Sequence, residues 1–479
     1  MNSTATSPRA LPGRLAEGFQ RWAFDRGLAT ANPPDATESL TRDVVALRME
    51  QVARAIYLFL LTGSVAFDTN FSHLHLTVRH LDIWITELGM AGIFILLVTR
   101  NVIEHRPWKL IGAPQVVLAA LLLWGVLMMF RHTAPLVAEL HDFALIYYCL
   151  FFFFFRELFT TRAQLIALLL AFGSAVAIVV VVAAVDVIRH DWVVLYNGQV
   201  RFITGQAALE SAAAFCFVLA AWRLVRRKAV VVLPLIALLV VVVLVQVRSL
   251  LVALAVGIAV MLLIDQHSRA LPRRQILTAA GIVVGLLAVG QLLLSHSWFG
   301  HYLLRSEQRL ISGITNPGQD ATGGFRLSAW AEALRRIGHQ PLTGQGFGVP
   351  FQWHWGALNI DVINRPHNTY LWLAVNAGLI GLAVLVIFVA TVYAGALRGI
   401  HAAASLEDYA IRLALLGALS AFVVFGALNL LLESPFLAIS FWTLAAAATV
   451  PPGALRQDRE ANPRPLIVSG KTAPAASPT

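Results

Sequence analysis

The sequence predicts an all-α membrane protein that crosses the bilayer about twelve times and carries one long outer loop late in the chain. Three observations support this prediction. Of the 479 residues, 58% are hydrophobic and only 13% are charged, and the mean hydropathy is +0.72. Apolar runs able to cross roughly 30 Å of hydrocarbon recur along the chain. Short charged loops separate these runs, as in polytopic helical proteins.

The apolar runs are assigned as spans in chain order. Before the long loop, the predicted spans are Val52–Phe67, Ile83–Val98, Leu110–Phe130, Phe143–Phe155, Gln164–Ile188, Ala207–Val225, Ala229–Val247, Leu250–Ile264 and Ile276–Leu294. After the loop, they are Leu371–Leu397, Leu413–Leu432 and Phe436–Val450. We expect residues 1–50 and 451–479 to be polar tails, the second of them disordered, and residues 51–450 to form one transmembrane domain.

Lysine and arginine are distributed unevenly between alternating loops. The side that holds fewer of them carries Arg79, Arg131, Arg189, Arg201 and Arg248. The positive-inside rule therefore predicts that both termini are cytoplasmic and that the loop over residues 295–370 lies outside, which in a bacterial inner membrane is the periplasm. Topology alone explains much of the net charge of +10, so we exclude nucleic acid as a partner and expect contacts with membrane lipids.

Three arginines are predicted to lie at the outer boundary of the membrane. Arg201 precedes the sixth span, Arg248 lies between two apolar runs, and Arg326 opens a stretch of the outer loop. Each arginine alone is explained equally well by snorkelling to lipid head groups. The three together favour an anionic ligand, because a guanidinium donates paired hydrogen bonds to phosphate and keeps its charge. A lipid-linked diphosphate would place its charge at this level.

The stretch "FRLSAWAEALRRIG" predicts a helix in the outer loop. Leu327, Trp330, Ala331 and Leu334 fall on one helical face, which indicates an amphipathic helix with Arg326 near its start.

Glycines and tryptophans follow this predicted helix. Gly344, Gly346 and Gly348 have a spacing seen in nucleotide-binding loops, but no buried strand precedes them, so we interpret them as a tight turn. Trp353 and Trp355 in "FQWHWGAL" are interpreted as anchors at the membrane interface rather than as a surface for stacking a sugar ring.

The segment "NRPHNTYLWLAVNAGLIG", residues 364–381, places His367 directly before a span. Together with "FRLSAWAEALRRIGHQPLTGQGFG" and the pair Arg248 and Ser249, it resembles the O-antigen ligase and polymerase superfamily of bacterial envelope enzymes. The resemblance covers the span count, the late outer loop and these three motifs, and it implies a fold similar to that of GT-C glycosyltransferases. Two departures are visible: Leu250 follows the Arg-Ser pair in place of a small residue, and the segment after Arg201 lacks the usual Pro-Asn.

This resemblance implies which residues are functional. Arg248, Arg326 and His367 match the family's functional arginines and histidine, with Arg201 as a further arginine that could bind the donor diphosphate. Supporting positions that match the motifs are Trp330, Pro341, Gly344, Gly346, Asn368, Tyr370, Gly378 and Gly381.

The implied reaction is transfer of a glycan from undecaprenyl diphosphate to a sugar hydroxyl of lipid A-core. Cations can stabilise a departing diphosphate, and a histidine with a pKa near 6.5 can accept the hydroxyl proton. We assign this role to His367, with His339 as the competing base and an interfacial helix cap as the alternative interpretation of His367. We expect no metal, no cofactor and no covalent intermediate, hence inversion at the transferred sugar, and a monomeric protein.

Other functions stay open at this point. The same donor could serve an O-antigen polymerase or a transferase that glycosylates protein. A transporter or flippase for lipid-linked sugars would also need basic groups near a diphosphate, but the halves of the sequence show no internal symmetry. Cys149 and Cys216 lie inside apolar runs without metal-ligand spacing, so we expect both to fill the core.

Overall fold

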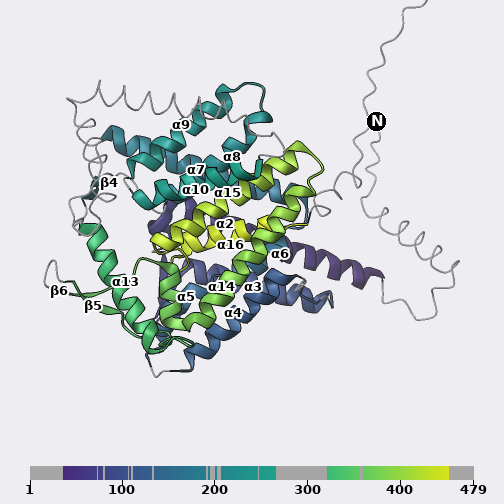
Figure 1. Ribbon diagram of the computed structural model, residues 1–479. Coiled ribbons are helices and arrows are strands. Elements are labelled where there is room, and N and C mark those ends of the chain that lie inside the picture. The colour runs from purple at the N-terminus through teal and green to yellow at the C-terminus, as the bar shows by residue number, and fades with distance from the viewer. Residues whose placement is uncertain are drawn as a thin grey trace, which may run out of the picture. The chain divides into compact units, whose positions relative to one another are not determined.

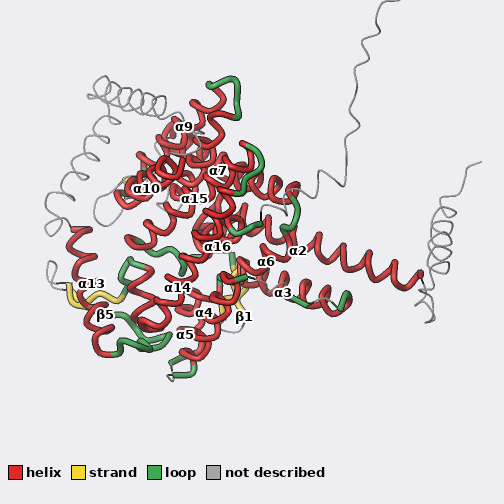
Figure 2. Tube along the Cα trace, turned by 45° about the vertical axis from the view of Figure 1, so that its right-hand side comes forward, coloured by secondary structure: helices red, strands yellow, loops and turns green. Residues whose placement is uncertain are grey.

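A computed structural model describes the residues 36–72, 74–78, 81–105, 107–108, 112–131, 134–189, 193–194, 200–201, 207–245, 247–265, 321–355 and 360–451. The described chain is mostly helical, as predicted (Figures 1 and 2). The predicted span Ile276–Leu294 and the first part of the outer loop lie outside these residues. The chain divides into two compact units, residues 1–57 with 91–108 and residues 58–90 with 109–479. Helices α2 (Ala36–Ser72) and α3 (Ile85–Ile103) contribute to both.

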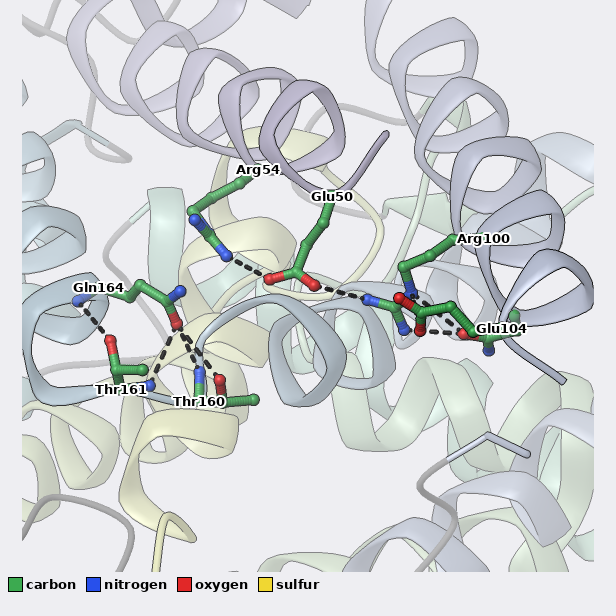
Figure 3. Close-up of polar contacts among 8 residues, drawn as sticks. Glu50, Arg54, Arg100, Glu104, Thr160, Thr161 and Gln164 are labelled. Atoms are coloured by element: carbon green, nitrogen blue, oxygen red, sulfur yellow. Dashed lines mark hydrogen bonds and ion pairs between the residues drawn. The ribbon is translucent and has the colours of Figure 1, made fainter. Parts of the chain in front are cut away.

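In the smaller unit, a buried arginine is held by polar partners. Arg100 is fully buried, and its guanidinium donates to Oδ1 of Asn101 at 2.8 Å and to Oε2 of Glu50 at 3.2 Å. Glu50 also pairs with Arg54 one turn further along α2 (Figure 3). These partners are needed because an unpaired buried charge costs several kcal/mol. Arg100 is therefore a structural residue of this unit.

The larger unit contains most of the helices. They are α4 (Ala113–Met129), α5 (Leu136–Tyr147), α6 (Leu150–Leu158), α7 (Arg162–Arg189), α8 (Ala207–Ala220), α9 (Ala229–Leu244), α10 (Arg248–Ile264), α13 (Ala321–His339), α14 (Thr369–His401), α15 (Leu406–Leu428) and α16 (Pro435–Ala448). Helix α15 packs against α8, α10, α14 and α16, and most of its residues are buried. The free cysteines Cys149 and Cys216 are fully buried, which confirms their predicted place in the core.

Helix α7 shows how the sequence sets a helix start. Thr161 precedes the helix, and its hydroxyl accepts the backbone N–H of Gln164 at 3.3 Å, while Oε1 of Gln164 accepts the backbone N–H of Thr161 at 3.1 Å (Figure 3). This reciprocal pair is a capping box, which satisfies backbone donors that have no partner inside the helix.

Four described helices, α3, α7, α14 and α15, are long and apolar enough to cross a membrane. The bent pair α5 and α6 would make a fifth span. Helices α4, α8, α9, α10 and α16 are apolar but shorter. The architecture is consistent with an all-α polytopic membrane protein, whereas the figure of about twelve spans stays a prediction.

The predicted fourth span, Phe143–Phe155, is wrong as a single helix. Helices α5 and α6 meet there at an angle of 47°. The hydroxyl groups of Tyr147 and Tyr148, at the bend, both donate to Oε1 of Glu87, at 2.8 and 2.7 Å. A carboxylate that binds both hydroxyls fixes the bend, and periodicity along the chain could not reveal this distant partner.

Small hairpins that the sequence analysis did not predict connect some helices. The antiparallel pairs are β1 (His75–Val78) with β2 (Leu81–Trp84), β3 (Val193–Val194) with β4 (Val200–Arg201), and β5 (Gln352–Trp355) with β6 (Ile360–Ile363). Trp353 and Trp355 point to one face of β5, are 5% and 8% exposed, and pack against the ring of Phe325. Their interpretation as interface anchors is therefore wrong, because the twofold alternation of the strand turns both indoles into the loop core.

Helix α14 breaks at Gly378, and the glycine loop fits into the break. Gly378 has a φ of +68°, and a Cβ there would lie 2.1 Å from the carbonyl oxygen of Leu342. The N–H of Leu379 donates to the carbonyl of Pro341 at 2.7 Å. The glycines of the loop all have positive φ values, namely Gly344, Gly346 and Gly348. This confirms the tight turn and explains why the loop and α14 both need glycine.

Candidate active site

The side chain of Asn429 joins two elements that carry predicted site residues. Asn429 follows the last residue of α15, and its Oδ1 accepts a hydrogen bond of 2.9 Å from Nη2 of Arg326 in α13. Its Nδ2 donates to the hydroxyl of Ser249, the residue after Arg248 at the start of α10. One amide therefore links the arginine of α13 to the Arg-Ser pair of α10.

His367 lies in a strained conformation directly before α14. Its φ of +50° is in the left-handed region, which costs a residue other than glycine about 1–2 kcal/mol. Helix α13 holds this segment in place: Nε1 of Trp330 donates to the carbonyl of Pro366 at 2.8 Å, and the ring of Phe325 meets the imidazole edge to face at 5.9 Å. The helix that carries Arg326 therefore also positions His367.

The first turn of α14 fixes the other side of His367. Asn368 is the N-cap, and its Oδ1 accepts two backbone N–H groups of that turn, the nearer in sequence from Tyr370 at 3.1 Å. The N–H of Thr369 donates to the carbonyl of Asn429 at 3.2 Å. The hydroxyl of Tyr370 donates to a carbonyl of α15 at 2.7 Å. Asn429 thus contacts the histidine segment through its backbone and Arg326 through its side chain.

The environment of His367 controls its charge. Burial of the imidazole and, second, the positive charge of Arg326 lower the pKa of His367 from 6.5 to about 4. The imidazole is therefore neutral at pH 7. A neutral proton acceptor and a fixed positive charge lie within electrostatic reach of each other at this site.

The remaining predicted residues are placed as follows. Arg248 is the first residue of α10 and is half-buried, which agrees with a break between two apolar runs. Arg201 lies in β4, where its backbone pairs with Val193 of β3. The structure describes only the backbone of Arg201, so the predicted role of its guanidinium stays a prediction. Tyr370, Asn368 and Trp330 all form hydrogen bonds that hold the backbone around His367, and their supporting role in the reaction stays a prediction.

His339, the competing base, is far from this cluster. It is exposed at the end of α13, where its Nε2 lies 3.2 Å from Nη1 of Arg335. With a rise of 1.5 Å per residue, His339 is roughly 20 Å along the helix from Arg326. The geometry favours His367 over His339 as a proton acceptor beside the arginines.

A buried carboxyl group that the sequence analysis missed completes the polar cluster. Oε2 of Glu433 accepts the hydroxyl of Thr369 at 3.2 Å and the backbone N–H of Leu431 at 3.1 Å. Burial raises the pKa of this carboxyl, and the positive charge of Arg365 partly opposes the change. The signal was present in "NLLLESP", where Asn429 and Glu433 interrupt an apolar stretch.

The predicted helix in the outer loop is confirmed as α13, but its predicted apolar face is wrong, because none of the four residues of that face is buried. Leu327 and Leu334 are exposed, whereas Ala329, Ala333 and Ile337 are buried. The helix turns its small residues toward the neighbouring elements, including α14 and β5. The size of a side chain predicts the buried face poorly where backbones approach closely.

A comparison with known families gives a match that includes several of these residues. Residues 233–386 match a family model described as O-antigen ligase. The match covers about a third of the chain and supports membership of the O-antigen ligase/polymerase family. The O-antigen ligase match runs from α9 into α14 and contains Arg248, Arg326 and His367, whereas Arg201 and Asn429 lie outside it. It does not distinguish a lipid A-core ligase from a polymerase, and no curated protein matches the chain.

Proposed function

We propose that this protein is a member of the O-antigen ligase family and transfers a glycan from undecaprenyl diphosphate to a sugar hydroxyl of lipid A-core at the periplasmic face of the bacterial inner membrane. The family match supports a ligase or polymerase type of function in O-antigen assembly. The observation that carries the finer proposal is the convergence of Arg326, the Arg-Ser pair of α10 and the segment of His367 on Asn429.

In the proposed reaction, Arg248 and Arg326 bind the diphosphate of the donor. The oxygen of the acceptor hydroxyl forms a bond to the anomeric carbon while the bond from that carbon to the diphosphate oxygen breaks. The bonding electrons leave with undecaprenyl diphosphate, whose added charge the guanidinium groups stabilise. His367 accepts the hydroxyl proton. A single displacement of this kind inverts the anomeric configuration.

The lowered pKa of His367 has a consequence for the order in which the donor and the acceptor bind. A pKa of about 4 keeps the imidazole neutral but makes it a weak base. A bound diphosphate would neutralise the charge of Arg326 and favour the imidazolium, so it would raise the pKa of His367 toward its ordinary value. Donor binding would therefore activate the base for the acceptor that arrives next.

The experiment uses the purified full chain in lipid nanodiscs with an undecaprenyl diphosphate glycan and lipid A-core, without nucleotide. We expect glycosylated lipid A-core on a gel, loss of product in His367→Ala, and near-normal product in His339→Ala, the matched control. Product made equally by both variants would remove His367 as the base.

Two further arms test the rest of the proposal. Donor glycans that extend one another while lipid A-core stays untouched would assign a polymerase instead. In liposomes, which enclose a compartment, movement of the donor across the bilayer without transfer would assign a flippase. We expect the rate to be unchanged by EDTA, because two guanidinium groups supply the positive charge that a metal would otherwise provide. Loss of activity in EDTA with recovery in Mg²⁺ would overturn metal independence.

A further inference from the structure

A cavity of about 460 Å³ lies next to the candidate active site. Its lining includes Ala138, His141 and Asp142 of α5, Asn364 and Arg365 after β6, and Leu430 after α15. The volume is within the range of roughly 300–1,000 Å³ that is usual for small-molecule sites. Two of these residues adjoin the site described above, because Arg365 precedes the His367 segment and Leu430 follows Asn429.

The polar side of the cavity is held rigidly. Nη2 of Arg365 lies 3.2 Å from Oδ1 of Asp142 and 2.9 Å from Nδ1 of His141. Oδ2 of Asp142 accepts the backbone N–H of Gly348 at 3.1 Å. The side chains of Asp142 and Arg365 are 14% and 17% exposed. Partners that are already fixed lose little entropy when a ligand binds, so this cluster is pre-organised.

The chemistry of the cavity differs from that of the arginine site. Asp142 and Arg365 form an ion pair, so their charges cancel and do not favour a diphosphate. The lining offers carboxylate and amide oxygens as acceptors and guanidinium and amide N–H groups as donors. A sugar hydroxyl both donates and accepts, and it suits such a mixed surface. An anionic ligand would instead meet the carboxylate of Asp142.

We propose that this cavity is the acceptor subsite, and that Asp142 and Arg365 bind hydroxyl groups of the saccharide that receives the glycan. This inference rests on the proposed transferase function, and it states where the second substrate, the acceptor, binds. Arg365 is joined to His367 through Pro366, whose carbonyl Trp330 holds. A saccharide held by Arg365 would therefore be fixed relative to the base.

The test measures initial rates in nanodiscs while lipid A-core and the undecaprenyl diphosphate glycan are varied separately. We expect Arg365→Gln and Asp142→Asn each to raise the acceptor KM about tenfold, the loss that corresponds to one hydrogen bond to a charged group. The donor KM should stay within about twofold. The matched controls are His354→Ala and Asp361→Asn, which remove an exposed pair with a distance of 3.1 Å on the β5–β6 hairpin and should leave both constants unchanged.

A second pair of variants leaves the polar cluster intact. Ala138→Trp places an indole in the cavity, whereas Val137→Trp places the same side chain on an exposed position that does not line it. We expect only Ala138→Trp to raise the acceptor KM. An active enzyme whose acceptor KM is unchanged in Ala138→Trp and Arg365→Gln would overturn the acceptor subsite. An equal rise in the donor KM would overturn it as well.

Measurements on the wild-type protein show which saccharide is the acceptor, and they test the proposed function separately from the cavity. If the wild type extends only lipid-linked donor glycans, the same KM comparison is made with that second glycan as acceptor, and a selective rise still supports the subsite. If the wild type forms no transferred product with either acceptor, the proposed function fails before the cavity variants are compared.

Discussion

Helix α13 carries Arg326 near its start and Arg336 near its end, and the two arginines have different partners. Arg336 donates to the carboxylate of Glu332, to Oε1 of Gln345 and to the carbonyls of two further loop residues, and its guanidinium lies 4.7 Å from the ring centroid of Phe351. Arg326 donates to a neutral amide, Asn429, which is shared with α10. Arg336 therefore holds a loop in place, whereas Arg326 lies among elements that are distant from one another in sequence.

The difference teaches how to separate structural from functional arginines. An ion pair with Glu332 offsets the charge of Arg336, so that its removal affects the loop first. Burial and, second, the charge of Arg326 lower the pKa of His367, so that removal of this charge changes the electrostatics of the candidate base. Substitution of Arg336 should therefore lower the stability of the protein first, whereas substitution of Arg326 should lower the transfer rate first.

The largest effect is expected for Arg326→Gln. In the proposed reaction the charge of Arg326 stabilises the departing diphosphate, so its loss should lower the transfer rate about 10²–10³-fold, as for removal of a donor in an oxyanion hole. The melting temperature should change much less than the rate, because glutamine keeps a polar amide at this position of α13. The measurement is the transfer rate in nanodiscs beside Tm in detergent; a large drop in Tm with a preserved rate per folded molecule would reverse the comparison.

Gly378→Ala tests the break in α14, into which the glycine loop fits. The positive φ and the approach of the Leu342 carbonyl leave no room for a Cβ, so we expect a loss of at least about 2 kcal/mol in the free energy of unfolding. Gly173→Ala in α7 is the matched control, since nothing lies within 4 Å of a Cβ there. Equal Tm values for the two variants would show that the break in α14 is not fixed by the loop.

Arg336→Gln should destabilise the protein by about 1–3 kcal/mol, because it removes partly buried hydrogen bonds to the loop that carries β5. Thermal unfolding measures this loss. The transfer rate of the molecules that remain folded should fall much less than in Arg326→Gln. If Arg336→Gln abolishes transfer at full stability, the charge of Arg336 takes part in the reaction.

The smallest effect concerns pH. With a pKa of about 4, His367 stays neutral down to about pH 5, so kcat/KM for the donor should be constant between pH 5.5 and 7.5. Because the folded pKa lies below the unfolded value near 6.5, the contribution of His367 to stability is complete above pH 6.5 and is lost as the pH falls toward 4. A midpoint near 6.5 in the profile of kcat/KM for the donor, which reports the free enzyme, would show an ordinary, solvated histidine.

The sequence predicted the parts of the site that depend on local patterns. The break before α10 at Arg248, the turn at Gly344 and the helix start after His367 follow from interruptions of apolar runs and from glycine, although α10 begins two residues before the predicted span Leu250–Ile264. The resemblance identified Arg326 because the motif around it is short and continuous. These features require only neighbours along the chain.

The sequence analysis did not predict the features that depend on partners distant in the chain. Asn429 joins α10, α13 and α14, and nothing near it in sequence signals three partners. The bend between α5 and α6 depends on Glu87, and the face that α13 buries depends on the backbones it meets. The Asp142–Arg365 pair joins residues far apart in the chain.

A direct titration of His367 tests the link between the base and the arginine most closely. The imidazole signal, assigned by its absence in His367→Ala, would be followed by NMR with labelled histidine in nanodiscs. We predict a midpoint near pH 4, an upward shift in Arg326→Gln, and an upward shift when undecaprenyl diphosphate binds. A midpoint near 6.5 that neither the substitution nor the ligand moves would contradict a donor site built around Arg326 and His367.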